Sequence, residues 1–122
     1  MQFQNLSYKD NNSFEERKEK FQIYQQKHPT KIPLIIERHP KCTLKLLDRP
    51  EVLIDETQKG TKLLQILQEK LQENSKNCSI FIFYTNTNTQ FPLESQMKEA
   101  AQNHKDEDGF LYLTYNNQET LG

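Results

Sequence analysis

Four short segments of the chain combine apolar, β-branched and aromatic residues in a way that predicts β-strands. Each has no more than six residues and is bounded by polar or proline-containing stretches. In the first segment Pro33 stands near the start, where a strand tolerates a missing amide group. The predicted strands cover residues 32–36, 51–55, 79–84 and 110–115.

Three other segments carry helix signals. Ser13–Glu16 is a capping box, so a helix begins there, and it ends before the proline at position 29. Leucine and isoleucine residues at helical spacing predict a central helix from about 61 to 73. Ser95 is expected to cap a short third helix. The apolar stripe of the first helix consists of Phe14, Phe21 and Tyr24.

The alternation of these elements predicts one small α+β domain. The order is helix, strand, strand, helix, strand, helix, strand, and a chain of 122 residues has room for a single core. We therefore expect a sheet covered on one face by helices. No apolar stretch approaches the ~20 residues of a membrane span, and residues 1–10 lack the apolar core of a signal peptide, so a cytosolic protein is expected.

Charge is distributed unevenly, although the net charge is only −1. Residues 1–49 hold ten Lys/Arg against six Asp/Glu, whereas residues 50–122 hold six against eleven. A basic amino-terminal half could favour acidic peptides or anionic lipid surfaces, and a solvated surface of mixed charge is the alternative.

The residue types that carry catalysis are scattered. The three histidines lie away from any Ser, Cys or Asp in a recognised nucleophile setting, and the glycines are isolated, so no catalytic residue or phosphate loop is predicted. Cys42 and Cys78 lie outside metal-ligand spacing and are expected to be reduced thiols. The aromatic segment 79–84 has no basic residues, which argues against nucleic-acid binding. We expect no enzyme activity, metal or cofactor.

Two features point to binding and conjugation instead. The segment 51–55, if it lies at a sheet edge, could accept an extended peptide by main-chain hydrogen bonds. Gly122, with no Cβ, follows a short polar tail and could enter a narrow enzyme channel to present its carboxylate.

A set of residues spread over nearly the whole chain occurs in an order shared with a known family. The set resembles the autophagy-related protein 8 (Atg8) family of ubiquitin-like modifiers. The resemblance implies a β-grasp ubiquitin-like fold with an amino-terminal helical extension over residues 1–27, a β-grasp domain over 28–116 and a conjugation tail over 117–122. The matching residues are Phe14, Glu15, Arg17, Pro29, residues 32–38, Pro40, Leu47, Asp48, Leu53, Ile54, Phe81, Phe83, Met97, Asp108, residues 110–112, Tyr115 and Gly122.

The function implied by this resemblance is conjugation of Gly122 to phosphatidylethanolamine. Activating and conjugating enzymes and a processing or delipidating cysteine protease would act on the chain. The conjugated protein, a monomer, would move from the cytoplasm to the autophagosome membrane and recruit cargo receptors through aromatic-x-x-aliphatic motifs. The alternative is an unconjugated ubiquitin-like peptide-binding adaptor.

The resemblance also implies two peptide-binding pockets beside the strand 51–55. At two positions this chain reverses the family's usual charges, with Lys20 and Glu51, and we hypothesise that these two attract each other across the first pocket. The family's basic cluster before this strand is reduced to Arg49. The aromatic pocket would consist of Lys20, Tyr24, Pro33, Glu51, Leu53 and Phe110, and the aliphatic pocket of Val52, Ile54, Leu63 and Ile66.

Overall fold

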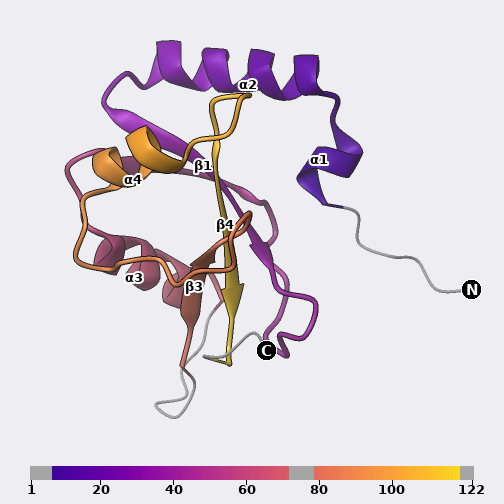
Figure 1. The fold of residues 1–122 in the computed structure, drawn as a ribbon, viewed down its shortest axis with the longest axis vertical. Coiled ribbons are helices and arrows are strands. Elements are labelled where there is room, and N and C mark those ends of the chain that lie inside the picture. Colours follow the sequence, from indigo (N-terminus) through magenta and orange to yellow (C-terminus); the bar gives the residue numbers. More distant parts are fainter. Residues whose placement is uncertain (1–6, 72–78, 119–122) are drawn as a thin grey trace, which may run out of the picture.

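The computed structural model describes residues 7–71 and 79–118, which form a four-stranded mixed sheet with helices on both faces (Figure 1). The strand order is β2-β1-β4-β3. The two central strands, β1 and β4, run parallel, and each edge strand is antiparallel to its neighbour. The elements in chain order are α1 (Tyr8–Asn11), α2 (Phe14–Lys27), β1 (Lys31–Arg38), β2 (Glu51–Asp55), α3 (Gly60–Lys70), β3 (Phe81–Tyr84), α4 (Met97–His104) and β4 (Leu111–Asn116).

Both amino-terminal helices begin with a capping box. In α2 the Glu16 N–H donates to the Ser13 Oγ at 3.2 Å and the Ser13 N–H donates to the Glu16 carboxylate at 2.7 Å, which confirms the predicted start. The four-residue α1 was not predicted, although Ser7 and Asp10 also form a capping box. A box with aspartate in place of glutamate, before so short a helix, is a weak sequence signal.

The expectation that helices cover only one face of the sheet is wrong. Along β1 successive side chains alternate between two apolar clusters: Leu34 and Ile36 belong to the cluster shared with α3 and α4, whereas Ile35 belongs to the other. The second cluster contains Tyr8 from α1 and has side chains of α2 packed against it. In Figure 1, α2 accordingly crosses one side of the sheet while α3 and α4 lie on the other.

The prediction that Ser95 caps α4 is also wrong. The N-cap residue is Gln96, and its side chain makes no capping hydrogen bond. The first amide groups of α4 donate instead to backbone carbonyl groups of the turn after β2, as in the 2.8 Å bond from Met97 N–H to Gln58 O. Since backbone acceptors satisfy the helix start, no side-chain cap is needed.

The start of α3 depends on the loop before α4 in the same way. The Gly60 N–H donates to the Ser95 carbonyl at 3.1 Å. A Cβ at position 60 would lie 2.7 Å from the ring of Phe91 and 2.8 Å from the Cα of Leu93. Glycine is therefore required for the two segments to approach each other.

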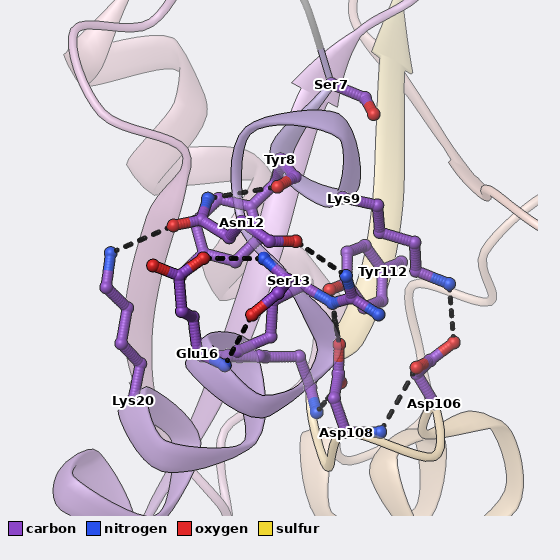
Figure 2. A network of polar contacts seen from close by, with 12 residues as sticks. Ser7, Tyr8, Lys9, Asn12, Ser13, Glu16, Lys20, Asp106, Asp108 and Tyr112 are labelled. Atoms are coloured by element: carbon purple, nitrogen blue, oxygen red, sulfur yellow. Dashed lines mark hydrogen bonds and ion pairs between the residues drawn. The ribbon is translucent and has the colours of Figure 1, made fainter.

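A buried ion pair fastens the amino-terminal helices to the sheet (Figure 2). The Arg17 Nε lies 2.8 Å from Asp108 Oδ2, and both side chains are largely inaccessible, with exposed fractions of 11% and 0%. The same carboxylate accepts from the Tyr112 hydroxyl at 2.6 Å. A second, more exposed pair joins Lys9 of α1 to Asp106 at 2.7 Å. Together these contacts hold α1 and α2 against the turn that precedes β4.

Gly109, in the turn before β4, has a φ of 104°, a backbone conformation that residues other than glycine rarely adopt. The ring of Phe21 from α2 lies where a Cβ at position 109 would be, with the nearest ring carbon only 2.4 Å from that point. The missing side chain thus lets α2 approach the sheet closely.

Within the described residues, no helix has the length and apolarity that a membrane span requires.

Candidate functional site

Within residues 7–71 and 79–118, the edge strand β2 carries unpaired backbone groups along its outer side. Hydrogen-bonded and non-hydrogen-bonded pairs alternate along an antiparallel ladder. The Ile36 N–H donates to the Pro50 carbonyl at 2.9 Å, so Ile36 and Pro50 form a hydrogen-bonded pair of the β1–β2 ladder. Counting along the register from this pair, the positions of Val52 and Ile54 are hydrogen-bonded and that of Leu53 is not. Val52 and Ile54 therefore direct their backbone groups toward β1. The N–H and C=O of Leu53 point away from the sheet.

A groove of about 600 Å³ follows this edge and opens on both sides of β2. Five of the ten residues predicted for the two pockets line it. Three of these, Tyr24, Glu51 and Leu53, were assigned to the aromatic pocket, and two, Val52 and Ile66, to the aliphatic pocket. The other five predicted residues, Lys20, Pro33, Phe110, Ile54 and Leu63, do not line the groove.

On the α2 side, two residues that were predicted for the aromatic pocket, Phe110 and Pro33, are buried. Phe110 has no exposed surface. Three rings from the amino-terminal helices contact it edge-on: Tyr8 with centroids 5.8 Å apart, Phe21 at 5.5 Å and Tyr24 at 6.3 Å. Pro33 is likewise buried. A ligand side chain could reach Phe110 only if one of the covering rings moved.

Tyr8 contacts both of the charged residues that were expected to attract each other. The Lys20 Nζ lies 5.6 Å from the centroid of the Tyr8 ring and 3.5 Å from the Asn12 Oδ1. Glu51 pairs instead with Arg49, at 3.8 Å. Among the described residues there is thus no direct ion pair between Lys20 and Glu51, because Tyr8 of α1 occupies this part of the face.

The hydroxyl group of Tyr8 is buried and has no hydrogen-bond partner of acceptable geometry among the described residues. Burial, followed by the nearby charge of Glu51, raises the pKa of Tyr8 far above its ordinary value. The Glu51 carboxylate lies near the Tyr8 hydroxyl, but the two groups do not form a hydrogen bond of acceptable geometry. The neutral form of Tyr8 is therefore the one present at neutral pH.

On the α3 side, two of the residues predicted for the aliphatic pocket lie in the core and two line the groove. Ile54 and Leu63 are core residues, with exposed fractions of 3% and 0%. Ile66 is half-buried at the groove, and Val52 forms the adjoining floor. An apolar side chain can therefore be accommodated between β2 and α3 without movement of the core.

Five further residues line the groove that the sequence did not assign to a pocket. Glu69 and Lys70 follow Ile66 by three and four positions, so they share its face of α3, and this spacing could have identified them. The remainder come from the segment before β2, whose irregular path gives no periodic signal: they are Leu47, Asp48 and Arg49.

The groove combines apolar side chains with three carboxylates, an arginine and a lysine. It contains no histidine, cysteine or hydroxyl nucleophile, and Tyr24 is its only phenol. In the described part of the chain, no cluster of three or more His, Cys, Asp or Glu side chains is arranged to hold a metal ion.

Gly122, the predicted conjugation site, lies outside the described residues. The last described residues leave the sheet next to the loop between β1 and β2. The Asn117 Nδ2 donates to the Thr43 Oγ1, and the Thr43 N–H donates to the Asn117 Oδ1 at 3.3 Å. The chain therefore leaves the domain at the end where β1 and β4 both finish (Figure 1).

The arrangement of strands and helices, and the sequence itself, match one family of known proteins. Residues 16–122 match the family model described as "Autophagy protein Atg8 ubiquitin like". The fold is similar to the crystal structure of Trypanosoma brucei ATG8, with a TM-score of 0.86, 27% identity, and coverage of 98% of this chain and 100% of that one.

Curated relatives agree with this match. Human microtubule-associated protein 1 light chain 3 gamma is 32% identical over 116 residues, which span 94% of this chain and 78% of the relative. Autophagy-related protein 8 of Schizosaccharomyces pombe is 30% identical over 115 residues, covering 94% and 93%. Both the resemblance and the β-grasp fold expected from it are thereby confirmed, and the chain belongs to the Atg8 family of ubiquitin-like autophagy proteins.

Proposed function

We propose that this chain is a ubiquitin-like modifier that is conjugated through Gly122 to phosphatidylethanolamine and recruits cargo receptors by their aromatic-x-x-aliphatic motifs during autophagosome formation. The observation that carries the recruiting role is the free edge of β2, bordered by a groove that opens on both faces of the sheet. The domain itself performs no catalysis.

The backbone of β2 supplies the affinity for an added strand. The outward N–H and C=O of Leu53 can pair with an extended peptide, which would become a fifth strand of the sheet. Edge strands present such unpaired groups as a template. Because these hydrogen bonds are made by the main chain, they select for an extended peptide without selecting its sequence.

The side chains around β2 account for the spacing of the motif. Residues i and i+3 of a strand point to opposite faces of a sheet. An aromatic residue on the α2 side, near Tyr24 and Leu53, therefore places the aliphatic residue on the α3 side, near Val52 and Ile66. A groove open on one face only could not accept both.

The charge around the groove predicts which flanking residues a motif peptide carries. Three carboxylates, those of Asp48, Glu51 and Glu69, line it together with two cations, Arg49 and Lys70. The groove thus has no excess of positive charge. We expect this chain to bind motifs with neutral flanks at least as well as motifs with acidic flanks.

Conjugation would use Gly122 and not the groove. An activating enzyme and a conjugating enzyme would pass the Gly122 carboxyl group to the lipid amine, and a cysteine protease would process or release it. Two acyl chains hold a protein on a bilayer where a single chain binds only marginally. The protein would thus be cytoplasmic when free and bound to the autophagosome membrane when lipidated.

Conjugation is tested by incubating the chain with the two enzymes, ATP and phosphatidylethanolamine liposomes. We expect a membrane-bound product that Gly122→Ala abolishes. If competent enzymes yield no product, the chain acts as an unconjugated adaptor.

Groove binding is tested separately by titrating a peptide that contains one aromatic-x-x-aliphatic motif. Leu53→Asp and Ile66→Asp change half-buried side chains on the two sides of β2 and should each weaken binding at least about tenfold, because each places a charge in an apolar contact. Ile23→Asp, on the exposed face of α2, is the matched control and should leave affinity unchanged. If all three variants changed the peptide affinity equally, the peptide would not bind beside β2.

A further inference from the structure

We propose that the segment between β1 and β2, residues 39–50, together with Arg38, docks on anionic phospholipid headgroups. We call residues 38–50 the basic loop. This inference rests on the proposed function, because lipid conjugation at Gly122 is what would bring the loop to a membrane. It concerns the orientation of the conjugated domain. Leu47, Asp48 and Arg49 of the basic loop also line the groove, whereas Lys41 and Lys45 do not.

The basic loop concentrates positive charge on an exposed surface. It contains four Lys/Arg residues and one acidic residue, Asp48, in thirteen positions. Three of the cations, Lys41, Lys45 and Arg49, have exposed side chains. On α2, by contrast, lysines alternate with glutamates, so charges of both signs are mixed there. The basic loop is thus a surface of one dominant sign.

An exposed apolar side chain stands among these cations. Leu46 follows Lys45 directly. Its side chain is 44% exposed, and it is one of three large apolar side chains that are exposed in the described structure. A leucine next to lysine and arginine side chains suits a bilayer interface, where the leucine enters the headgroup region and the cations meet phosphate groups. An acidic peptide would explain the cations but would leave Leu46 without a role.

The domain holds the basic loop rigidly. Cys42 and Leu44 point into the core while the residues between and beside them are exposed. The Tyr115 hydroxyl donates to the Lys45 carbonyl at 2.8 Å, and the Arg38 Nη1 donates to the Leu44 carbonyl at 2.8 Å. The cations are therefore presented from a fixed backbone, which lowers the entropy lost on docking.

The chain leaves the domain beside this same loop. Asn117 is hydrogen-bonded to Thr43, and the His39 N–H donates to the Tyr115 carbonyl at 2.9 Å. Gly122 follows Asn117 by five residues, so even a fully extended tail reaches only about 18 Å. Once Gly122 is bonded to a lipid, the basic loop is always within reach of the bilayer surface.

The size of the effect follows from the charge. One Lys or Arg close to an anionic leaflet favours the bound state about fivefold at moderate salt. Because Arg49 is paired with Glu51, the estimate counts only Lys41 and Lys45, which have no ion pair among the described residues. These two cations favour the docked orientation about twenty-five-fold. Because the attraction is electrostatic, it should weaken as salt concentration rises.

The test bypasses enzymatic conjugation, so its failure is distinguishable from failure of the proposed function. A full-length chain carrying Cys78→Ser and Gly122→Cys is coupled through the new thiol to maleimide-phosphatidylethanolamine in lipid nanodiscs; Cys42 is buried and is left in place. The discs contain phosphatidylcholine with or without 30% phosphatidylserine, and a trace of lipid with a nitroxide on its headgroup. Loss of amide NMR intensity then identifies the face nearest the bilayer.

We expect residues 41–46 to lose at least half of their intensity in phosphatidylserine discs, and to recover it in phosphatidylcholine discs or at 500 mM salt. The double variant Lys41→Glu/Lys45→Glu should abolish the difference between the two discs. The control Lys18→Glu/Lys27→Glu makes the same charge change on α2 and should preserve it. The spectra themselves report whether each variant is folded.

Two results would overturn the proposal. In one, residues 41–46 are broadened equally in both kinds of disc, or another face is broadened more. In the other, a glutamate-rich peptide shifts the resonances of residues 41–46 at low salt while the discs leave them unchanged, which would make the loop a site for acidic peptides.

Discussion

Tyr8 links the amino-terminal helix to the candidate site at the level of a single side chain. Its ring covers Phe110, and its buried hydroxyl has no hydrogen-bond partner in the described part of the chain. An unpaired buried hydroxyl destabilises a fold by about 1 kcal/mol or more. The sequence marked Tyr8 neither as a core residue nor as part of a pocket, because an isolated aromatic residue before a capping box has no periodic signal.

Replacement of this tyrosine tests whether the hydroxyl is unpaired. Tyr8→Phe keeps the contact with Phe110 and removes the buried hydroxyl, so we expect the free energy of unfolding to rise by about 1 kcal/mol in urea denaturation. The same variant should bind a motif peptide with unchanged affinity. A fall in stability would mean that the hydroxyl donates to Glu51 after all.

Glu37 gives the fold a defined dependence on pH. Its carboxylate accepts from the Tyr8 N–H at 2.7 Å. Burial, with the nearby charge of Asp10, raises the pKa of Glu37 above its ordinary value of 4.5 and outweighs the lowering by the Tyr8 N–H hydrogen bond and by Lys9. The folded state therefore binds more protons than the unfolded state between pH 4.5 and the raised value. Stability associated with this group is present below pH 4.5 and is lost as the pH rises through that window.

Glu37→Gln tests this sign. Glutamine retains an oxygen that can accept from the Tyr8 N–H and removes the charge, so the variant should gain stability relative to the parent chain as the pH rises from 4 to 7. Urea denaturation at a series of pH values measures the difference. Glu19→Gln, at an exposed position of α2, is the control. A gain that stays constant with pH would contradict the assignment.

Among the elements, α2 depends most on a single contact, the buried pair of Arg17 and Asp108. Breaking a buried pair by removing one partner costs about 3–5 kcal/mol, because the other charge is left buried. Pairs at the surface contribute about 1 kcal/mol or less. The pair formed by Lys9 and Asp106 is of the second kind, with exposed fractions of 46% and 25%.

The two pairs therefore predict different losses of stability for the same chemical change. Arg17→Met should lower the free energy of unfolding by about 3–5 kcal/mol, whereas Lys9→Met should lower it by less than about 1 kcal/mol. Chemical denaturation followed by circular dichroism measures both. Similar losses in the two variants would show that the buried pair has no special role in fastening the extension.

Elements with strong local signals could be predicted from the sequence, and those set by tertiary contacts could not. The start of α2 was predicted because Ser13 and Glu16 act within one turn, and β2 because its residues are bounded by Pro50 and a polar turn. The cap assigned to Ser95 was wrong because carbonyl groups far away in the sequence satisfy α4. Phe110 was expected to line a pocket, but three rings from α1 and α2 enclose it.

At the scale of the whole molecule, two separate surfaces serve the two proposed activities. The groove lies along the β2 edge, whereas the chain leaves the domain beside Thr43, at the end where β1 and β4 finish. A conjugated domain would thus be anchored at one end while its free edge remains accessible. This separation is why conjugation and peptide binding can be tested with different variants.

The central claim is that the outward backbone of β2 receives a peptide strand, and amide hydrogen exchange of Leu53 tests it most directly. In the free protein this N–H points away from the sheet, whereas the N–H of Ile54 is paired with β1. At saturating concentrations of an aromatic-x-x-aliphatic peptide, we predict that exchange at Leu53 slows at least about tenfold while exchange at Ile54 changes little. Binding that leaves the exchange rate of Leu53 unchanged would contradict the account.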